Sequence, residues 1–346
     1  MKNRINLNKF NIHTDLVIDN DINNSYTKKT KINDSLSITC IDINDEIGTK
    51  LNKKKGLYVT IEFSDITNHE DKIEIEKCVI DELKKMLEKN KIKNADEVLV
   101  IGLGNRFSTA DSLGPKTIDK ILITRHLFEL GADVKDGIRC VSGISPGVMA
   151  STGIETFDII MGIIKKIKPK FIIAIDALAS SSIDRINKTI QLTDTGIHPG
   201  SGIGNNRKEI SLETVGIPVI AIGVPTVVES SIIVSDTIYY LFKHLSYIKD
   251  NFDENKLVLN HGTDYISRIK NKDLDIEEKK NLSGIIGTLS EEEKLDLTRE
   301  VLNSINYNMI VTPKEIDFLI DNLCEVISRG INKSLHSEMN NKKKDD

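Results

Sequence analysis

Three short apolar runs constrain the fold of this chain more than any other feature. They read EVLVIGLG at 97–104, KFIIAIDAL at 170–178 and IPVIAIGVP at 217–225. Such runs are typical of strands that are buried on both faces of a sheet. Helical patterns lie between or after them, at 113–130, 152–169 and 230–245. The alternation predicts an α/β fold with a mainly parallel or mixed central sheet and helices on both faces.

Other elements flank this core in the sequence. Further strands are expected at 35–43, 56–63, 138–143 and 188–194, and further helices at 71–89, 291–305 and 313–333. Ser290 and Glu293 form a predicted capping box before one C-terminal helix. Residues 1–33 are rich in Asn, Lys and Asp and predict an exposed or loosely docked arm. The charged NNKKKDD end predicts a disordered tail.

Composition excludes several classes of protein. The formal net charge of −5, from 47 basic and 52 acidic residues, gives no reason to expect nucleic-acid or membrane-surface binding. The N-terminus lacks the apolar segment of a secretory signal, and no run reaches the roughly 18 to 20 apolar residues of a spanning helix. We therefore expect an intracellular protein. Its four cysteines are scattered, which favours reduced thiols over disulfides or a zinc site.

A glycine loop follows the first apolar run, in VLVIGLGNRFSTADSLGP at 98–115. Gly102 and Gly104 match the start of a dinucleotide fingerprint, but Phe107 stands where the third glycine belongs. No Gly-Lys-Ser/Thr follows, so a Walker loop is excluded as well. The two glycines are better explained as residues that let the chain leave the strand sharply.

Two carboxylates stand out near the predicted strand ends. Asp111 is either an N-cap of the next helix or a functional group. Asp176 follows five apolar residues, where an unpartnered carboxylate is costly to bury. A long glycine-rich loop at 191–211 adds further polar residues, including His198 and Arg207. Ligand sites in open α/β sheets form at the carboxyl ends of strands, so we expect these loops to converge.

The motifs TADSLGP, IIAIDALAS, TIQLTDTGIHPGSGIGN and IPVIAIGVPTVV resemble those of the spore germination proteases. The resemblance covers nearly the whole chain. It implies a core like that of hydrogenase-maturation proteases and phosphorylases, with an N-terminal extension and C-terminal helices. It also implies an endopeptidase that degrades small acid-soluble, DNA-protecting spore proteins at germination. A homotetramer in the cytoplasm of the developing forespore and in the spore core is implied as well.

The same resemblance assigns the proposed catalytic acids to Asp111 and Asp176. In the expected mechanism one carboxylate activates a water and the other, protonated, acts as the acid. Gly102, Gly104, Asn105 and His198 are expected to support the site, and backbone N–H groups of the loops can stabilise the oxyanion. The expected domains are a propeptide at 1–15, one α/β peptidase domain at 16–334 and a tail at 335–346. The resemblance places self-processing between Asp15 and Leu16.

Alternatives remain open at this point. No cofactor is expected, but Asp111, Asp176 and His198 together form a possible O/N ligand set for a divalent metal. A peptide-binding protein without activity, or a small-molecule hydrolase or phosphorylase on a related core, also fits the fold.

Overall fold

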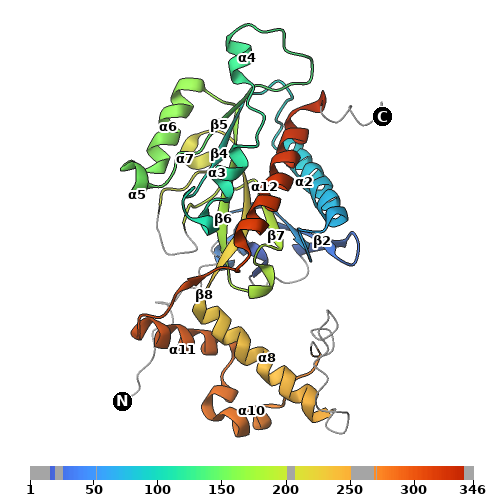
Figure 1. Ribbon diagram of the computed structural model, residues 1–346, viewed down its shortest axis with the longest axis vertical. Helices are drawn as coiled ribbons and strands as arrows, with labels where there is room; N and C mark the ends of the chain where they lie inside the picture. Colours follow the sequence, from blue (N-terminus) through green and yellow to red (C-terminus); the bar gives the residue numbers. More distant parts are fainter. Residues whose placement is uncertain are drawn as a thin grey trace. The chain divides into compact units, whose positions relative to one another are not determined.

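One mixed sheet organises the described part of the chain (Figure 1). The computed structural model describes residues 16–19, 26–51, 53–200, 207–250, 269 and 271–338. The strands run in the spatial order β1-β2-β3-β7-β8-β6-β4-β5, and β9 pairs with β8. Their bounds are β1 Thr27–Lys31, β2 Leu36–Ile43, β3 Gly56–Phe63, β4 Val98–Gly102, β5 Val141–Ile144, β6 Phe171–Ser180, β7 Thr189–Thr193, β8 Val219–Glu229 and β9 Ile310–Val311.

Strand direction divides the sheet into two parts. β4 pairs in parallel with both β5 and β6, as the buried apolar runs predict. The strands β1, β2, β3, β7 and β8 pair with one another in antiparallel fashion. The expected α/β fold with a mixed central sheet is confirmed, and the parallel part is the one that carries Asp176.

Helices cover both faces of the sheet. Their bounds are α1 Asp45–Leu51, α2 His69–Lys89, α3 Leu113–Ile118, α4 Arg125–Glu129, α5 Met149–Thr152, α6 Thr156–Ile167, α7 Leu212–Val215, α8 Ser230–Asp250, α10 Ile276–Ser283, α11 Glu291–Ser304 and α12 Ile316–Leu335. α2 and α12 lie side by side on one face, where their apolar side chains join one core cluster (Figure 1). α6 and α7 contribute Ile160 and Val215 to a second cluster on the other face.

Contacts divide the described residues into two compact units. The larger unit contains the sheet up to Val227 and the last helix, and the smaller contains Ser181–Ile183 and Val228–Val311. In the smaller unit, Lys279 and Lys294 lie over the ring of Phe242, at 5.6 and 5.3 Å from its centroid. One peptidase domain over 16–334 stays a prediction.

The predicted capping box is confirmed. The Ser290 hydroxyl accepts the Glu293 N–H at 3.2 Å, and the Glu293 carboxylate accepts the Ser290 N–H at 2.8 Å. α12 ends at Leu335, and residues 339–346 lie outside the described part. Among the described helices, none is both long enough and apolar enough to cross a membrane.

The predicted single helix at 113–130 is wrong. α3 ends at Ile118 and α4 begins only at Arg125, because tertiary hydrogen bonds capture the residues between them. The Leu122 N–H donates to the Asn332 side chain, and the Thr124 hydroxyl donates to the Arg139 carbonyl at 2.5 Å. These long-range bonds replace the local ones that a continuous helix would make.

The prediction of a loosely docked arm at 1–33 also needs correction. Leu16 and Val17 are fully buried, and residues 27–31 form the edge strand β1. The low apolar content of the arm concealed two anchoring side chains that pack into separate core clusters.

α3 lies against the sheet through two glycines. A Cβ on Gly114 would stand 2.2 Å from the Leu103 carbonyl oxygen and 2.7 Å from that of Ile175. A Cβ on Gly102 would stand 2.3 Å from the Gly114 carbonyl oxygen. Because the neighbouring atoms are backbone atoms, they cannot give way as a side chain would.

We therefore expect Gly114→Ala to destabilise the chain by about 1–3 kcal/mol through overpacking. The measurement is the free energy of unfolding in urea. Gly162→Ala is the matched control, since Gly162 lies in α6 with nothing within 4 Å of its added Cβ. The control should be neutral or stabilised by about 0.5–1 kcal/mol. Equal midpoints for the two variants would contradict the close packing of α3.

Candidate active site

The end of β4 and the middle of β6 form the frame of the site. Gly102 pairs with Ile175 in the parallel ladder, and the Leu103 N–H donates to the Ile175 carbonyl at 2.8 Å. Asp176 follows immediately. β6 itself continues to Ser180, so Asp176 does not lie at a strand end as predicted. It lies inside β6, one residue beyond the last pairing with β4, where the neighbouring strand has already turned away.

The loop after β4 closes on Asp111. The Asn105 N–H donates to the Asp111 carboxylate at 2.8 Å and to its carbonyl oxygen at 3.0 Å. Gly104 has φ +107°, and a Cβ there would stand 2.2 Å from the Asp111 carbonyl oxygen and 2.8 Å from its carboxylate. Gly104 is thus required both by its backbone conformation and by the space that Asp111 takes.

Asp111 is not the N-cap of the helix that follows. Ser112 occupies the N-cap position of α3 and makes no side-chain cap bond. The Asp111 carboxylate turns back to Asn105 instead. The Asn105 N–H is therefore used to orient Asp111, and the Thr226 hydroxyl holds the loop by donating to the Ala110 carbonyl at 2.7 Å.

Burial raises the pKa of the Asp111 carboxyl above its ordinary value of 3.8. The Asn105 hydrogen bond and the positive charge of Arg207 oppose this shift. Burial disfavours the ionised form, whereas a donor and a cation favour it. In the sequence, Arg207 is one of several polar residues in the long loop at 191–211. Its spacing from Asp111 does not indicate that its charge acts on that carboxyl.

Asp176 has different surroundings. Its side chain is 5% exposed, and the N–H of the next residue, Ala177, donates to its carboxylate at 2.9 Å. One carboxylate is thus buried within a strand and the other is half-buried in a loop. A pair of acids in unlike surroundings suits acid–base chemistry, because the two protons need not leave together.

His198 lies on the same long loop as Arg207 but has another partner. Its Nε2 is 3.4 Å from a Glu209 carboxylate oxygen, and its side chain is half-exposed. Lys54 also pairs with Glu209, at 2.5 Å. Within the described residues, which include Asp111, Asp176 and His198, no group of three or more His, Cys, Asp or Glu side chains is arranged to hold a metal ion.

The processing site is described only on one side. Asp15 lies outside the described residues, whereas Leu16 is fully buried. Leu16 belongs to the apolar cluster that contains Leu103 and Leu178. In the sequence, Leu103 lies in the glycine loop and Leu178 follows Asp176 by two residues.

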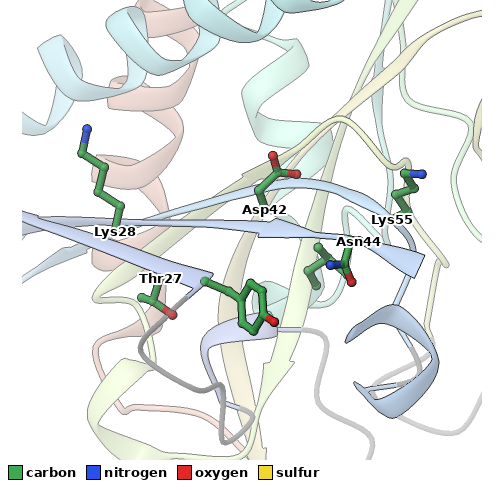
Figure 2. A pocket seen from close by; sticks show the side chains of 7 residues that line it. Thr27, Lys28, Asp42, Asn44 and Lys55 are labelled. Atoms are coloured by element: carbon green, nitrogen blue, oxygen red, sulfur yellow. The ribbon is translucent and has the colours of Figure 1, made fainter. Parts of the chain in front are cut away.

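A hollow of the described surface lies elsewhere, at the edge formed by β1 and β2 (Figure 2). Its volume is about 540 Å³, and it is lined by Tyr26, Thr27, Lys28, Asp42, Ile43, Asn44 and Lys55. Lys28 and Lys55 stand on opposite sides of it, and their amines do not converge (Figure 2). Lys55 already pairs with Asp45 at 2.8 Å. We therefore locate the candidate chemistry at the ends of β4 and β6.

Comparison with known proteins decides the family. The family model described as germination protease matches residues 11–346. This chain belongs to the germination protease family. The germination protease of Priestia megaterium is 44% identical over 98% of this chain and 97% of its own length. That of Oceanobacillus iheyensis is 45% identical over 93% of this chain and 89% of its own length.

Similarity to a solved structure is more distant. A [NiFe] hydrogenase maturation protease from Thermococcus kodakarensis matches with a TM-score of 0.26 and 17% identity. The match covers 42% of this chain and 80% of that one. Membership of a peptidase family therefore rests on the germination proteases alone.

The raised pKa of Asp111 predicts how pH acts on stability. The folded chain holds the proton of the Asp111 carboxyl more tightly than the unfolded chain does. The protonated carboxyl therefore contributes its full stability below pH 3.8. That contribution is lost as the pH rises through the raised pKa. In Asp111→Asn the amide oxygen still accepts the Asn105 N–H, and no charge is buried. We expect its urea midpoint to match the parent near pH 4 and to exceed it at pH 8. Parallel pH profiles would contradict the raised pKa.

Proposed function

We propose that this chain is the endopeptidase that begins the degradation of small acid-soluble, DNA-protecting spore proteins at germination. It is made as a zymogen and cuts itself between Asp15 and Leu16. Family membership supports the peptidase activity at germination, and the substrate class follows from the resemblance of the sequence motifs. One observation carries the assignment of the chemistry: the loop that holds Asp111 starts from the end of β4, at the point where β4 stops pairing with β6 just before Asp176.

The proposed mechanism is water attack assisted by two carboxylates. An ionised carboxylate removes a proton from water, and the other, protonated, donates to the scissile carbonyl or to the leaving amine. Because close carboxylates titrate as a pair, neither Asp111 nor Asp176 is given a fixed role. Arg207 adds a positive charge on the Asp111 side, which can stabilise the developing oxyanion. The mechanism uses no cofactor.

Assembly is part of the proposal. A homotetramer is supported by exposed apolar side chains on the smaller unit. They include Ile276, Leu282, Ile285, Ile305 and Tyr307, each more than half exposed. Exposed apolar groups in such number are typical of an interaction surface. The proposed site of action is the cytoplasm of the forespore and the spore core.

The activity is tested with two isosteric variants and a matched control. Asp111→Asn and Asp176→Asn should each lower kcat/KM for a small acid-soluble spore protein by about 10²-fold to 10⁴-fold or more. Both should also leave the Asp15–Leu16 bond intact in mass spectra. Asp194→Asn is the control, since this carboxylate serves structure by pairing with Lys89 at 2.8 Å. Activity like the parent's in either test variant rejects the mechanism.

A metal-dependent route is distinguished in the same assay. The expected result is activity that survives exhaustive chelation and does not rise when zinc, manganese or magnesium is added back. Loss on chelation with recovery on metal addition would replace the two-carboxylate mechanism by a metal-assisted one.

The oligomer is tested by sedimentation. Ile285→Glu, at a side chain that is 80% exposed, should shift the sedimentation coefficient from a tetramer to a smaller species. Ile154→Glu, at a 53% exposed side chain in the larger unit, is the control and should leave it unchanged. An unchanged sedimentation coefficient in Ile285→Glu would show that Ile285 lies outside the tetramer interface.

A further inference from the structure

A row of buried polar side chains crosses the antiparallel strands on the face opposite α2 and α12. Thr39 of β2 pairs with Thr60 of β3, and Thr60 pairs with Gln191 of β7. Paired residues point to the same face of a sheet. All three are at most 5% exposed. Polar groups in such a position are costly unless they bind something. We call these three residues the polar row.

The floor beside the polar row is made of small residues. Gly223 of β8 pairs with Gln191, and Ala221 lies two residues earlier on the same face. A Cβ on Gly223 would stand 2.3 Å from a methyl group of Leu178 on β6, so no side chain fits there. Asp176 precedes Leu178 by two residues and shares its face of β6. Gln191 and Asp176 therefore stand on either side of β8, above the same face of the sheet.

The segment that follows the proposed cut lies on this floor. The Val17 N–H donates to the Gln191 side-chain oxygen at 2.9 Å, and this bond is buried. Val17 packs in a cluster with Ile41 and Tyr58 of β2 and β3. Leu16 packs in the cluster that contains Ala221 and Leu178. From Val17 to Leu16 the chain thus runs from β2 and β3 toward the strand that carries Asp176.

A second observation points to the same use of the polar row. The Thr60 hydroxyl is buried beside Gln191 and has no hydrogen-bond partner among the described residues. A hydroxyl with unused donor and acceptor capacity suits a backbone that lies across the strands.

We propose that Gln191 is a positioning residue for self-processing. By accepting the Val17 N–H it fixes the register of the chain and so selects the Asp15–Leu16 bond for cleavage. The inference rests on the proposed function, because it requires that the chain cuts itself there.

The experiment follows the cutting of the full chain by mass spectrometry. Gln191→Met removes the acceptor and keeps the size of the side chain, whereas Gln191→Glu keeps an acceptor oxygen. We expect Gln191→Met to slow the cut by about tenfold or more, as the loss of a hydrogen bond to the reacting segment implies. It should also scatter the cut over neighbouring bonds. Gln191→Glu should cut at one position.

Val17→Pro tests the same bond from the other side. It removes the donor and leaves Gln191 unchanged, and proline is tolerated at the first position of the short 3₁₀ helix Val17–Asp19. We expect the same slower, scattered cutting. The double variant should be no worse than either single one, because both changes remove one bond. This variant keeps the test valid if Gln191→Met fails to fold.

Thr189→Val is the matched control. Thr189 lies two residues before Gln191, on the same strand and face, and is equally buried. The control should cut at the parent's rate and position. Parent-like cutting in Gln191→Met or Val17→Pro overturns the inference. The inference is also overturned if the test variants and Thr189→Val all cut more slowly at the parent's position. That result would indicate a general loss of packing.

A substrate cleaved in trans separates this inference from the proposed function. If a chain that begins at Leu16 cleaves a spore protein but the full chain never cuts at Asp15–Leu16, the role of Gln191 is overturned and the peptidase stands. If neither reaction occurs, the proposed function fails as well.

Discussion

The close approach of α3 to the place where β4 ends beside β6 sets the geometry of both carboxylates. Gly102 and Gly114 have no side chains, so backbone meets backbone where the two strands part. The Leu103 N–H continues the ladder to the Ile175 carbonyl, and the loop to Asp111 starts from that fixed point. Sites held by packed elements are positioned more tightly than sites on free loops. Asp111 belongs to a loop, but this loop is tied to the strand frame at both of its ends.

The two acids differ because the frame treats them differently. Asp176 lies within β6 between apolar residues of the chain and accepts the N–H of its neighbour Ala177. Asp111 stands outside the ladder, with a backbone donor and a nearby cation to compensate for its burial. This difference follows from topology: β6 extends beyond β4, so one carboxylate remains in the sheet and the other leaves it. The surroundings of Asp111 and Asp176 thus differ because of the strand lengths, without any special residue type.

The sequence predicted the parts of this arrangement that depend on local pattern. The apolar runs identified β4 and β6. The incomplete dinucleotide fingerprint led to the correct prediction that Gly104 is a turn residue. It did not predict what depends on distant partners. The break after Ile118 arises from hydrogen bonds to Asn332 and Arg139, which no local pattern contains. The N-cap alternative for Asp111 failed for another reason: its carboxylate turns back to the Asn105 N–H, which precedes it in the same loop.

Gln191 shows a second limit. The alternation in TIQLT indicates a strand with polar residues on one face, but only what packs on that face decides whether it is solvated or buried. Here Val17 packs on it and donates its N–H to Gln191. The burial of Leu16 and Val17 was not predicted, because two apolar residues in a polar arm carry no periodicity. Their role emerges only when the segment packs across the sheet.

The burial of Leu16 and Val17 also weakens the binding of any other chain to the same floor, because both side chains must first be withdrawn. Burying each side chain is worth about 1.5–3 kcal/mol, so withdrawing both costs about 3–6 kcal/mol. The floor is then vacant in roughly one molecule in a hundred to one in twenty thousand. A chain arriving from solution meets an occupant that is tethered and never diluted. A second chain that used this floor would first have to displace Leu16 and Val17, so its apparent affinity would fall by the same factor.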